Sequence, residues 1–336
     1  MKLQILSPLV IMLISLAACN PQSTSKTSQQ TALASWNNTE TKNAIISYVE
    51  DVTNKQSSNH IEIADRIAVF DNDGTLWPEK PFYFQLYYAI DKVKEKAADH
   101  PEWKNQEPFK SVLENNIENV LKQGEHALIE LVLATHSNLS AEAFENEVVE
   151  WIQSSRHPEK DKLFTDLIYQ PMLELIQYLK ANDFTVFIVS GGGVDFIRAW
   201  SEEVYGISKH EVIGSSLLSA YNSNTASINK LAKIDFIDDK EGKPVGIHKT
   251  IGRQPVFCAG NSDGDLAMMQ YTAANKLKNF QLYVHHTDEK REWKYDRESN
   301  VGRFDKALDE SIKNGWTLAD MAKDWQVIYP FELDSE

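Results

Sequence analysis

The amino-acid sequence predicts an α/β fold: a doubly wound parallel sheet with a helical cap inserted after its first strand. Four short apolar runs have the length and composition of buried parallel strands. Amphipathic segments at helical spacing separate these runs, and strands that alternate with helices favour a parallel sheet covered by helices. The four runs are 67–70, 184–189, 255–259 and 280–284.

The segment 78–167 lies between the first two runs and has almost only helical spacing. It is long enough for a small helical bundle, which we interpret as the cap. Residues 36–77 and 168–336 then form the core domain. Within the core we expect six helices, at 36–51, 171–180, 194–203, 266–272 and 304–314 and from Gly242-Lys243-Pro244 onward, and two further short strands, at 212–214 and 234–237.

The composition limits the classes of protein to which the chain can belong. It has 336 residues, 42% of them hydrophobic, and a formal net charge of −15. This is enough for a large core, either as one domain with an insertion or as two domains. The acidic balance argues against a nucleic-acid partner, whose phosphates would require a basic face. The oligomeric state stays open.

Residues 1–19 have the pattern of an export signal rather than of the fold. Lys2 is followed by an apolar stretch, 6–16, that is short for a membrane-spanning helix. Leu16-Ala17-Ala18-Cys19 then resembles a bacterial lipoprotein signal, in which the cysteine is lipidated and becomes the new N-terminus. A plain secretory signal cut at small residues is the alternative. The other cysteine, Cys258, lies in an apolar run and is interpreted as a buried small hydrophobic residue.

Residues 20–35 are rich in Ser, Thr and Gln and are predicted to be a flexible tether between the lipid anchor and the folded body. We therefore expect a protein of the bacterial cell envelope, lipid-anchored to a membrane. Because residue 20 is Asn rather than the Asp associated with inner-membrane retention, the periplasmic side of the outer membrane is favoured.

An acidic pair follows the first apolar run, in Asp71-Asn72-Asp73-Gly74-Thr75. Residues at the carboxyl end of a parallel strand face the crevice where α/β proteins bind ligands. Side chains at i and i+2 share a face, so Asp71 and Asp73 are expected to converge. Two converging carboxylates require a cation or a shared proton, and Mg²⁺ would supply the charge. The alternative is an ordinary capped turn.

Two more polar clusters follow later apolar runs. Ser190-Gly191-Gly192-Gly193 ends the second run and precedes a predicted helix, which favours an anion site built from a hydroxyl and backbone N–H groups. A flexible loop or a Ser helix cap is the alternative. The segment 260–265 ends the third run and offers the oxygen ligands of Asn261, Asp263 and Asp265. Lys243 and Lys249 precede the third run, and either could pair with Asp71.

Together, these motifs make the chain resemble the haloacid-dehalogenase-superfamily phosphatases over about residues 60–290. The first motif, D-x-D-G-T, falls on Asp71 to Thr75, the second on Ser190 and the acidic fourth on Gly260 to Asp265. The Ser-Gly-Gly start and the helical insertion are most similar to the phosphoserine-phosphatase-like branch. Asn261 departs from the Asp that is usual there, and Lys243, as Lys-Pro, resembles the usual third-motif lysine more closely than Lys249 does.

The resemblance implies a role for each residue of the site. Asp71 is the nucleophile that forms an aspartyl-phosphate, and Asp73 is the general acid and base. Phosphate binding is assigned to Ser190, Gly191, Gly192 and Lys243, with Thr75, which we expect to shape the turn. Mg²⁺ is assigned to Asp71, the Asp73 carbonyl, Asn261 and Asp265, although Asp263 stays open as a ligand.

The implied activity is a metal-dependent phosphomonoesterase that acts outside the cytoplasm on a small phosphorylated substrate. Phosphoserine phosphatases place an acid shortly after the first motif, and Glu79 is one residue away from that place, where Lys80 stands. A scavenging phosphatase of broader range is therefore favoured. The alternatives are a phosphotransferase to an alcohol and a catalytically weak ligand-binding lipoprotein. His285 and His286 are expected near the crevice, in a supporting rather than a chemical role.

The anchor prediction has a direct test. Cys19→Ala removes the thiol that would be lipidated, so the variant is expected to be soluble or unprocessed, whereas the parent chain partitions with membranes. Mass spectrometry of the mature N-terminus provides the measurement. An unmodified Cys19, or cleavage at another position, would contradict the prediction.

Overall fold

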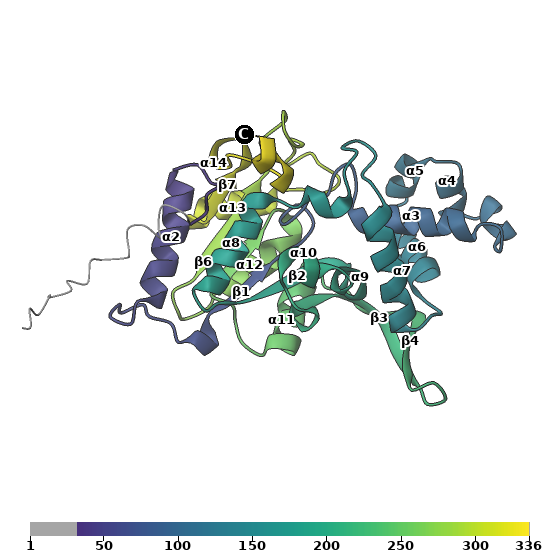
Figure 1. Ribbon diagram of the computed structural model, residues 1–336, viewed down its shortest axis with the longest axis horizontal. Coiled ribbons are helices and arrows are strands. Elements are labelled where there is room, and N and C mark those ends of the chain that lie inside the picture. Colours follow the sequence, from purple (N-terminus) through teal and green to yellow (C-terminus); the bar gives the residue numbers. More distant parts are fainter. Residues whose placement is uncertain (1–31, 336) are drawn as a thin grey trace, which may run out of the picture. The chain divides into compact units, whose positions relative to one another are not determined.

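The computed structural model describes residues 32–335, so Cys19, the predicted signal and residues 20–31 of the tether lie outside the described part of the chain. Figure 1 shows the arrangement of the elements. The strands are β1 (Ile67–Phe70), β2 (Thr185–Gly193), β3 (Val212–Asn222), β4 (Ser227–Phe236), β5 (Phe257–Gly260), β6 (Phe280–His285) and β7 (Thr317–Asp320). The α-helices are α2 (Glu40–Thr53), α3 (Phe84–Lys96), α4 (Phe109–Leu113), α5 (Ile117–Lys122), α6 (Glu125–His136), α7 (Ala141–Ser154), α8 (Gln170–Ala181), α9 (Val194–Arg198), α10 (Ser201–Tyr205), α11 (Gly242–Ile251), α12 (Leu266–Ala273), α13 (Lys306–Asn314) and α14 (Met321–Asp324).

The seven strands form one sheet in the order β4-β3-β2-β1-β5-β6-β7. All neighbours are parallel except β3 and β4, which form an antiparallel hairpin. β1 is central, between β2 and β5, and each of its four residues is buried. The predicted doubly wound α/β fold is confirmed, and the central place of β1 explains its continuous apolar sequence.

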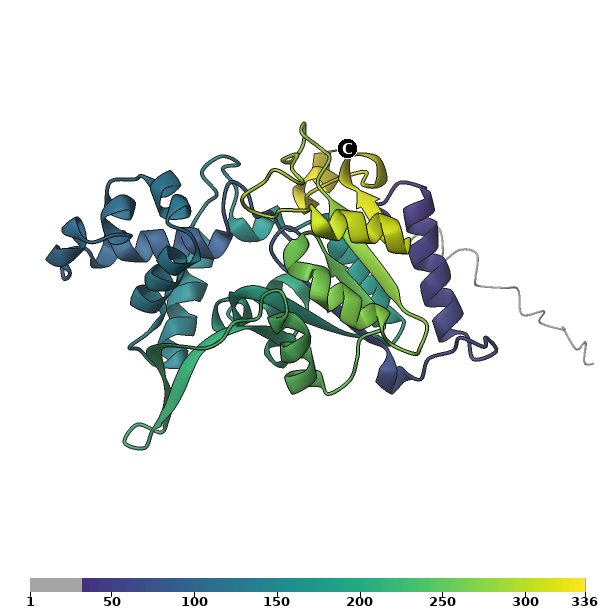
Figure 2. The same cartoon turned by 180° about the vertical axis from the view of Figure 1, so that it is seen from behind.

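Alternate residues of each strand face opposite sides of the sheet, and each side has its own hydrophobic core. Ala68 and Phe70 of β1 pack in one core with α2 and α8, whereas Ile67 and Val69 pack in the other with α11, α12 and α13. Figures 1 and 2 show these two sets of helices on opposite faces of the sheet. The result is the three-layer architecture that alternating strands and helices predict.

Helices α3 to α7 lie between β1 and β2 in the chain, within the segment predicted to be the cap. Inner residues of α3 to α6, among them Val93, Val112 and Leu131, form a third hydrophobic cluster, whereas the buried face of α7 belongs to the first core. The β3–β4 hairpin extends from the sheet to this part of the molecule, and β4 packs against α6 and α7 (Figures 1 and 2). The cap region therefore contacts the core both through this hairpin and through α7, which packs against α9.

Several boundaries differ from those predicted. The helix expected at 194–203 is divided into α9 and α10, and Trp200 at the division has its ring stacked on Trp77 with 4.4 Å between centroids. The two short strands expected after residue 211 are the first residues of β3 and the last residues of β4, which together form a long hairpin. The outer part of this hairpin is polar, so no apolar run in the sequence indicated that it forms strands. β7 was not predicted.

The folded body also begins before the predicted end of the tether. Leu33 is buried, and Ser35 bonds to Glu174 through both its N–H and its hydroxyl, at 2.8 and 2.7 Å. Among residues 32–335, no helix has the length and apolarity that a membrane span requires.

A matched pair of substitutions tests the core. Ile176 on α8 is fully buried, whereas Ile312 on α13 is 65% exposed. Ile176→Ala is expected to lower the free energy of unfolding by about 2–5 kcal/mol, because it removes apolar contacts and leaves a cavity. Ile312→Ala is expected to change it by less than about 0.5 kcal/mol. Urea denaturation of both variants checks this, and equal losses would contradict the burial described here.

Candidate active site

Three neighbouring strands end at the same edge of the sheet, and the chemically active side chains lie there. Asp71 follows β1, Ser190 lies near the carboxyl end of β2, and Asn261 follows β5. The Asp71 N–H still donates to the Ala259 carbonyl of β5, at 2.9 Å, which keeps the backbone extended up to the first carboxylate. The parallel order β2-β1-β5 thus brings together residues that are far apart in the sequence.

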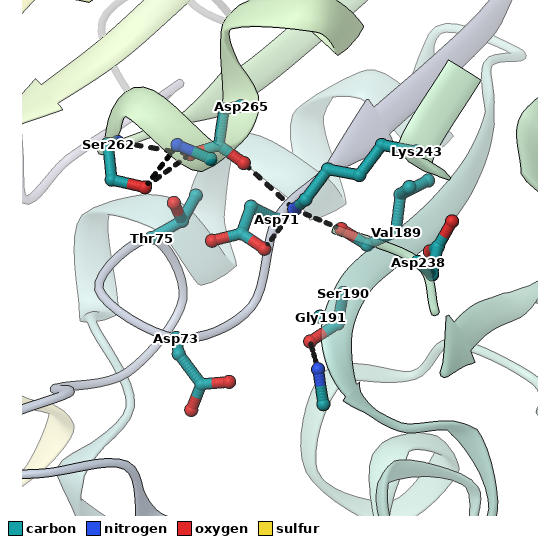
Figure 3. Close-up of polar contacts among 12 residues, drawn as sticks. Asp71, Asp73, Thr75, Val189, Ser190, Gly191, Asp238, Lys243, Ser262 and Asp265 are labelled. Atoms are coloured by element: carbon teal, nitrogen blue, oxygen red, sulfur yellow. Dashed lines mark hydrogen bonds and ion pairs between the residues drawn. The ribbon is translucent and has the colours of Figure 1, made fainter. Parts of the chain in front are cut away.

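Lys243 links these three strand ends. Its Nζ donates to Asp71 Oδ1 at 2.5 Å and to the Val189 carbonyl at 2.8 Å, and it lies 2.8 Å from Asp265 Oδ1. Figure 3 shows the ammonium between these three oxygens. Lys249, the alternative lysine, is exposed and lies over the Phe236 ring at 4.6 Å. The structure therefore brings Lys243, and not Lys249, to the acidic pair.

The charges at this site are strongly coupled. Burial opposes the charge on Lys243, but Asp265 and Asp71 outweigh it and raise the pKa of the ammonium above its usual value. Burial raises the pKa of Asp71 well above normal, and the charge of Asp265 adds to this, while Lys243 opposes it. The single lysine is thus shared between two carboxylates.

Asp73 lies on the loop after Asp71 and has a different environment. Its Oδ1 accepts a hydrogen bond from the Trp77 indole N–H at 2.8 Å. Burial raises the pKa of Asp73 to about 6, although the bond from Trp77 opposes the shift. A carboxyl group with a pKa near 6 can both give and take a proton close to neutral pH. Its Oδ2 lies near Gly192, 3.6 Å from where a Cβ on that glycine would stand.

Gly74 allows the loop to turn sharply beneath the site. Its φ is +76°, and a Cβ there would lie 2.1 Å from Asn261 Nδ2 and 2.5 Å from Glu79 Oε1. The His286 ring Nε2 lies 2.7 Å from the Gly74 carbonyl, so this imidazole bonds to the loop backbone rather than reaching the acidic pair. His285 is half-buried, and its Nε2 lies 3.9 Å from Asp296 Oδ2.

The glycine-rich segment bulges out of the sheet. Ser190 pairs with Gly214 of β3, but the next pair is Gly193 with Ser215, so Gly191 and Gly192 leave the ladder. The Gly192 N–H donates to Ser190 Oγ at 3.0 Å, and the Gly193 N–H donates to Gln85 Oε1 at 2.8 Å. The three glycines line the same cavity as Asp73, whereas Ser190 is fully buried beneath them. Gly193 is engaged by helix α3, and the phosphate site stays a prediction.

The two aspartates of the fourth motif, Asp263 and Asp265, contact different parts of the structure. Asp265 Oδ2 accepts from the N–H groups of Asn261 and Ser262, at 2.9 and 3.0 Å, while its Oδ1 faces Lys243. Asp263 Oδ1 accepts from the N–H groups of Asp305 and Ala307, at the start of α13. Asp265 therefore orders the loop and pairs with the lysine, while its role as a metal ligand stays a prediction. Asp263 is bonded to the start of α13 and is directed away from the acidic pair.

Asn261 is held by two neighbours that determine how its amide is oriented. Its Nδ2 donates to Glu79 Oε1 at 2.6 Å, and its Oδ1 accepts from Thr75 Oγ1 at 3.2 Å. The reverse orientation would set the amide oxygen against a carboxylate. Thr75, which was assigned to phosphate binding, therefore supports Asn261. Tyr295 also donates to Glu79 Oε1, at 2.8 Å.

The donor set at this edge suits a hard divalent cation. Asp71 and Asp265 pair with Lys243, and two further buried or half-buried carboxylates, those of Asp73 and Glu79, lie close enough for their charges to interact with Asp71. Burial raises the pKa of Glu79 well above normal, and the charges of Asp73 and Asp71 add to this. Such an excess of negative charge is relieved by a cation. Within residues 32–335, no three His, Cys, Asp or Glu side chains are arranged as a metal-ligand group, so an amide or a backbone oxygen would have to complete the ligand set.

Sequence reasoning did not assign Glu79 and Gln85 to the site. Glu79 was noted only as standing one residue away from a family position, because its contact with Asn261 depends on the fold of the loop between them. Gln85 lies on a cap helix among apolar residues, and nothing in the local sequence indicates that it accepts the Gly193 N–H.

Several solved structures are similar to this chain. A conserved, functionally unknown protein from Anaerococcus prevotii is 17% identical, with 83% of this chain and 91% of that chain covered and a TM-score of 0.48. A protein of unknown function from Bordetella pertussis is 13% identical, with 76% and 98% covered and a TM-score of 0.49. A phosphoserine phosphatase, solved as an analogue of the phospho-aspartyl intermediate, is 15% identical, with 81% and 98% covered and a TM-score of 0.37.

No curated protein matches the sequence. A family model described as haloacid dehalogenase-like hydrolase matches residues 68–270, which is more than half of the chain. The match begins within β1, extends through the cap and the glycine-rich segment, and ends within α12, so it contains Asp71, Lys243 and Asp265. The chain therefore belongs to the haloacid dehalogenase-like hydrolases.

Proposed function

We propose that this chain is a phosphomonoesterase that works through an aspartyl-phosphate on Asp71. The observation that carries the proposal is the geometry around that carboxylate. Asp71 stands at the end of the central strand, Lys243 is bonded to its Oδ1, and Asp73 follows two residues later with a pKa near neutrality. A nucleophile, a cation and a proton carrier are the parts that phosphoryl transfer to a carboxylate requires.

The first step forms the intermediate. Because Lys243 is bonded to Oδ1, we assign attack on the phosphorus to Asp71 Oδ2. A bond forms from this oxygen to phosphorus while the bond from phosphorus to the alcohol oxygen breaks. Asp73, in its protonated form, gives its proton to that leaving oxygen.

The second step releases phosphate. Asp73, now a carboxylate, takes a proton from a water molecule, whose oxygen bonds to phosphorus. The Asp71–phosphorus bond breaks, and both carboxyl groups return to their starting states. We assign binding of the phosphoryl oxygens to the Ser190 hydroxyl, Lys243 and the N–H groups of Gly191 and Gly192. The Gly192 N–H would exchange its present bond to Ser190 Oγ for a phosphoryl oxygen.

A divalent cation, Mg²⁺ by the family resemblance, would be held by the Asp71 carboxylate, the Asp73 backbone carbonyl and the Asn261 amide oxygen. When bound, it would neutralise phosphoryl charge that one lysine cannot balance. Glu79 beside Asn261 adds negative charge to the same region. We further propose that the enzyme is anchored in the cell envelope through Cys19, which rests on Leu16 to Cys19 alone.

The two aspartates are separable by substitution. Asp71→Asn keeps the shape but removes the nucleophilic charge, so hydrolysis of p-nitrophenyl phosphate is expected to be abolished. Asp73→Asn removes the proton carrier and is expected to lower kcat by about 10²–10⁴-fold. Asp99→Asn, at an exposed position in the cap, is the control and should keep full activity.

Mass spectrometry of acid-quenched enzyme identifies the residue that is modified. A phosphoryl group is expected on the peptide that contains Asp71, with more of it in Asp73→Asn, where hydrolysis is slow. Phosphate on any other residue, or a fully active Asp71→Asn, would refute the mechanism.

The metal prediction separates Asn261 from Asp263, two of the three residues, with Asp265, that the sequence left open as direct ligands. Removal of divalent cations by a chelator should abolish the phosphatase activity, and added Mg²⁺ should restore it. Asn261→Ala removes a proposed ligand and is expected to raise the half-saturating Mg²⁺ concentration at least about tenfold. Asp263→Ala removes a partner of the α13 backbone and should lower Tm without changing the Mg²⁺ requirement. The opposite pattern would move the metal ligand from Asn261 to Asp263.

A further inference from the structure

A large cavity extends from the acidic pair into the cap. Its volume is about 880 Å³, and it is lined by Asp71, Asp73, the glycine-rich bulge, helices α3, α5 and α6 and the β3–β4 hairpin. Pockets of about 300–1,000 Å³ hold organic molecules of drug size, whereas a phosphate ion occupies a small part of such a volume. The remaining volume is available to the leaving group of a phosphate ester.

Helix α6 turns an apolar stripe toward this cavity. Ala127 and Leu131 pack in the cap's own hydrophobic cluster. Leu128 and Val132, one turn apart on another face, line the cavity and are only half-buried. A helix that is apolar on two faces normally buries both. Leu128 also packs against the edge of the cap's hydrophobic cluster, and both Leu128 and Val132 still expose apolar surface to the cavity.

The opposite walls continue this apolar surface. Leu86 of α3 lines the cavity from the cap, and Leu217 and Ile234 line it from the hairpin. Leu217 and Ile234 are paired across the two strands, so their side chains lie next to each other on the hairpin. Apolar side chains from three separate elements thus form a continuous part of the cavity wall beyond the acidic pair, beside polar lining residues such as Glu118, Ser215 and Ser216.

The cations that line the cavity are already neutralised. Each of its lysines has a carboxylate partner: Lys122 pairs with Glu118, Lys230 with Asp195, Lys240 with Asp239, and Lys243 with Asp71 and Asp265. Burial lowers the pKa of His136 to about 3, so its ring is uncharged at neutral pH. No arginine among residues 32–335 lines the cavity. The two buried lysines, Lys230 and Lys243, are held in their ion pairs, so neither is free to bind a second phosphate or a carboxylate on the substrate.

We propose that the physiological substrate is a phosphate monoester of an uncharged, apolar alcohol, such as a medium-chain alkyl or aryl alcohol, whose apolar part lies between α6 and the β3–β4 hairpin. This inference rests on the proposed phosphomonoesterase function and specifies its leaving group. The phosphoryl group lies at Asp71, and the chain or ring replaces water along the apolar walls.

A series of alkyl phosphates tests the proposal. We expect kcat/KM to rise from ethyl to butyl, hexyl and octyl phosphate by up to about fourfold per added methylene, since each buried methylene contributes binding energy that is available in the transition state. Phosphoserine, phosphoethanolamine and glycerol phosphate should be poorer than hexyl phosphate. A flat series, or a preference for one of these polar esters, would overturn the proposal while leaving the phosphatase function intact.

Substitutions on α6 locate the binding surface. Val132→Thr is nearly isosteric and introduces a hydroxyl, and Leu128→Gln introduces an amide. Each should lower the kcat/KM for octyl phosphate relative to the kcat/KM for ethyl phosphate, because a polar group replaces apolar surface. The double variant should lower this ratio by about tenfold or more. Ile312→Gln, exposed on α13, is the control and should leave the ratio unchanged. An unchanged ratio in the correctly folded double variant would remove α6 from the site. Failure of the parent enzyme to hydrolyse any ester, p-nitrophenyl phosphate included, would overturn the proposed function and this inference together.

Discussion

The geometry of this site depends on one buried ammonium group. Lys243 reaches the nucleophilic carboxylate after β1, the backbone at the end of β2 and the acid that orders the loop after β5. A buried ion pair adds little to stability, but removing one partner leaves an uncompensated charge in a poorly solvated place. The lysine therefore specifies how three strand ends meet, and helix α11, which carries it, cannot shift without disturbing all of them.

The amide at position 261 follows from the same electrostatic constraint. The family pattern has an acidic residue at position 261. An acidic residue at this position would add a fifth carboxylate to those of Asp71, Asp73, Glu79 and Asp265. As Asn, residue 261 instead donates to Glu79 and so keeps this neighbouring acid buried within hydrogen-bond distance. The departure from the family pattern and the presence of Glu79 are thus two parts of one arrangement, in which the residue after β5 donates to a buried glutamate and adds no carboxylate of its own.

Much of this arrangement could be predicted from the sequence. β1 matched its apolar run at both ends, because a strand buried on both faces has a continuous apolar signature. Lys243 was preferred over Lys249, and the structure brings it to Asp71.

Other features left no such signature. The outer part of the β3–β4 hairpin is held by ladder hydrogen bonds that any side chain permits, so its polar sequence did not indicate strands. The contacts of Glu79 with Asn261 and of Gln85 with Gly193 join residues 182 and 108 positions apart, and only the fold brings them together.

The glycine bulge has a mechanical consequence. Strand β3 pairs with β2 on both sides of Gly191 and Gly192, and the same strand continues outward into the hairpin whose β4 packs on α6 and α7. One continuous strand therefore connects the segment that would bind phosphate to the helices that line the leaving-group end of the cavity. A displacement of the cap would pull on β3 and alter the bulge, so filling one end of the cavity is mechanically coupled to the alignment of the other.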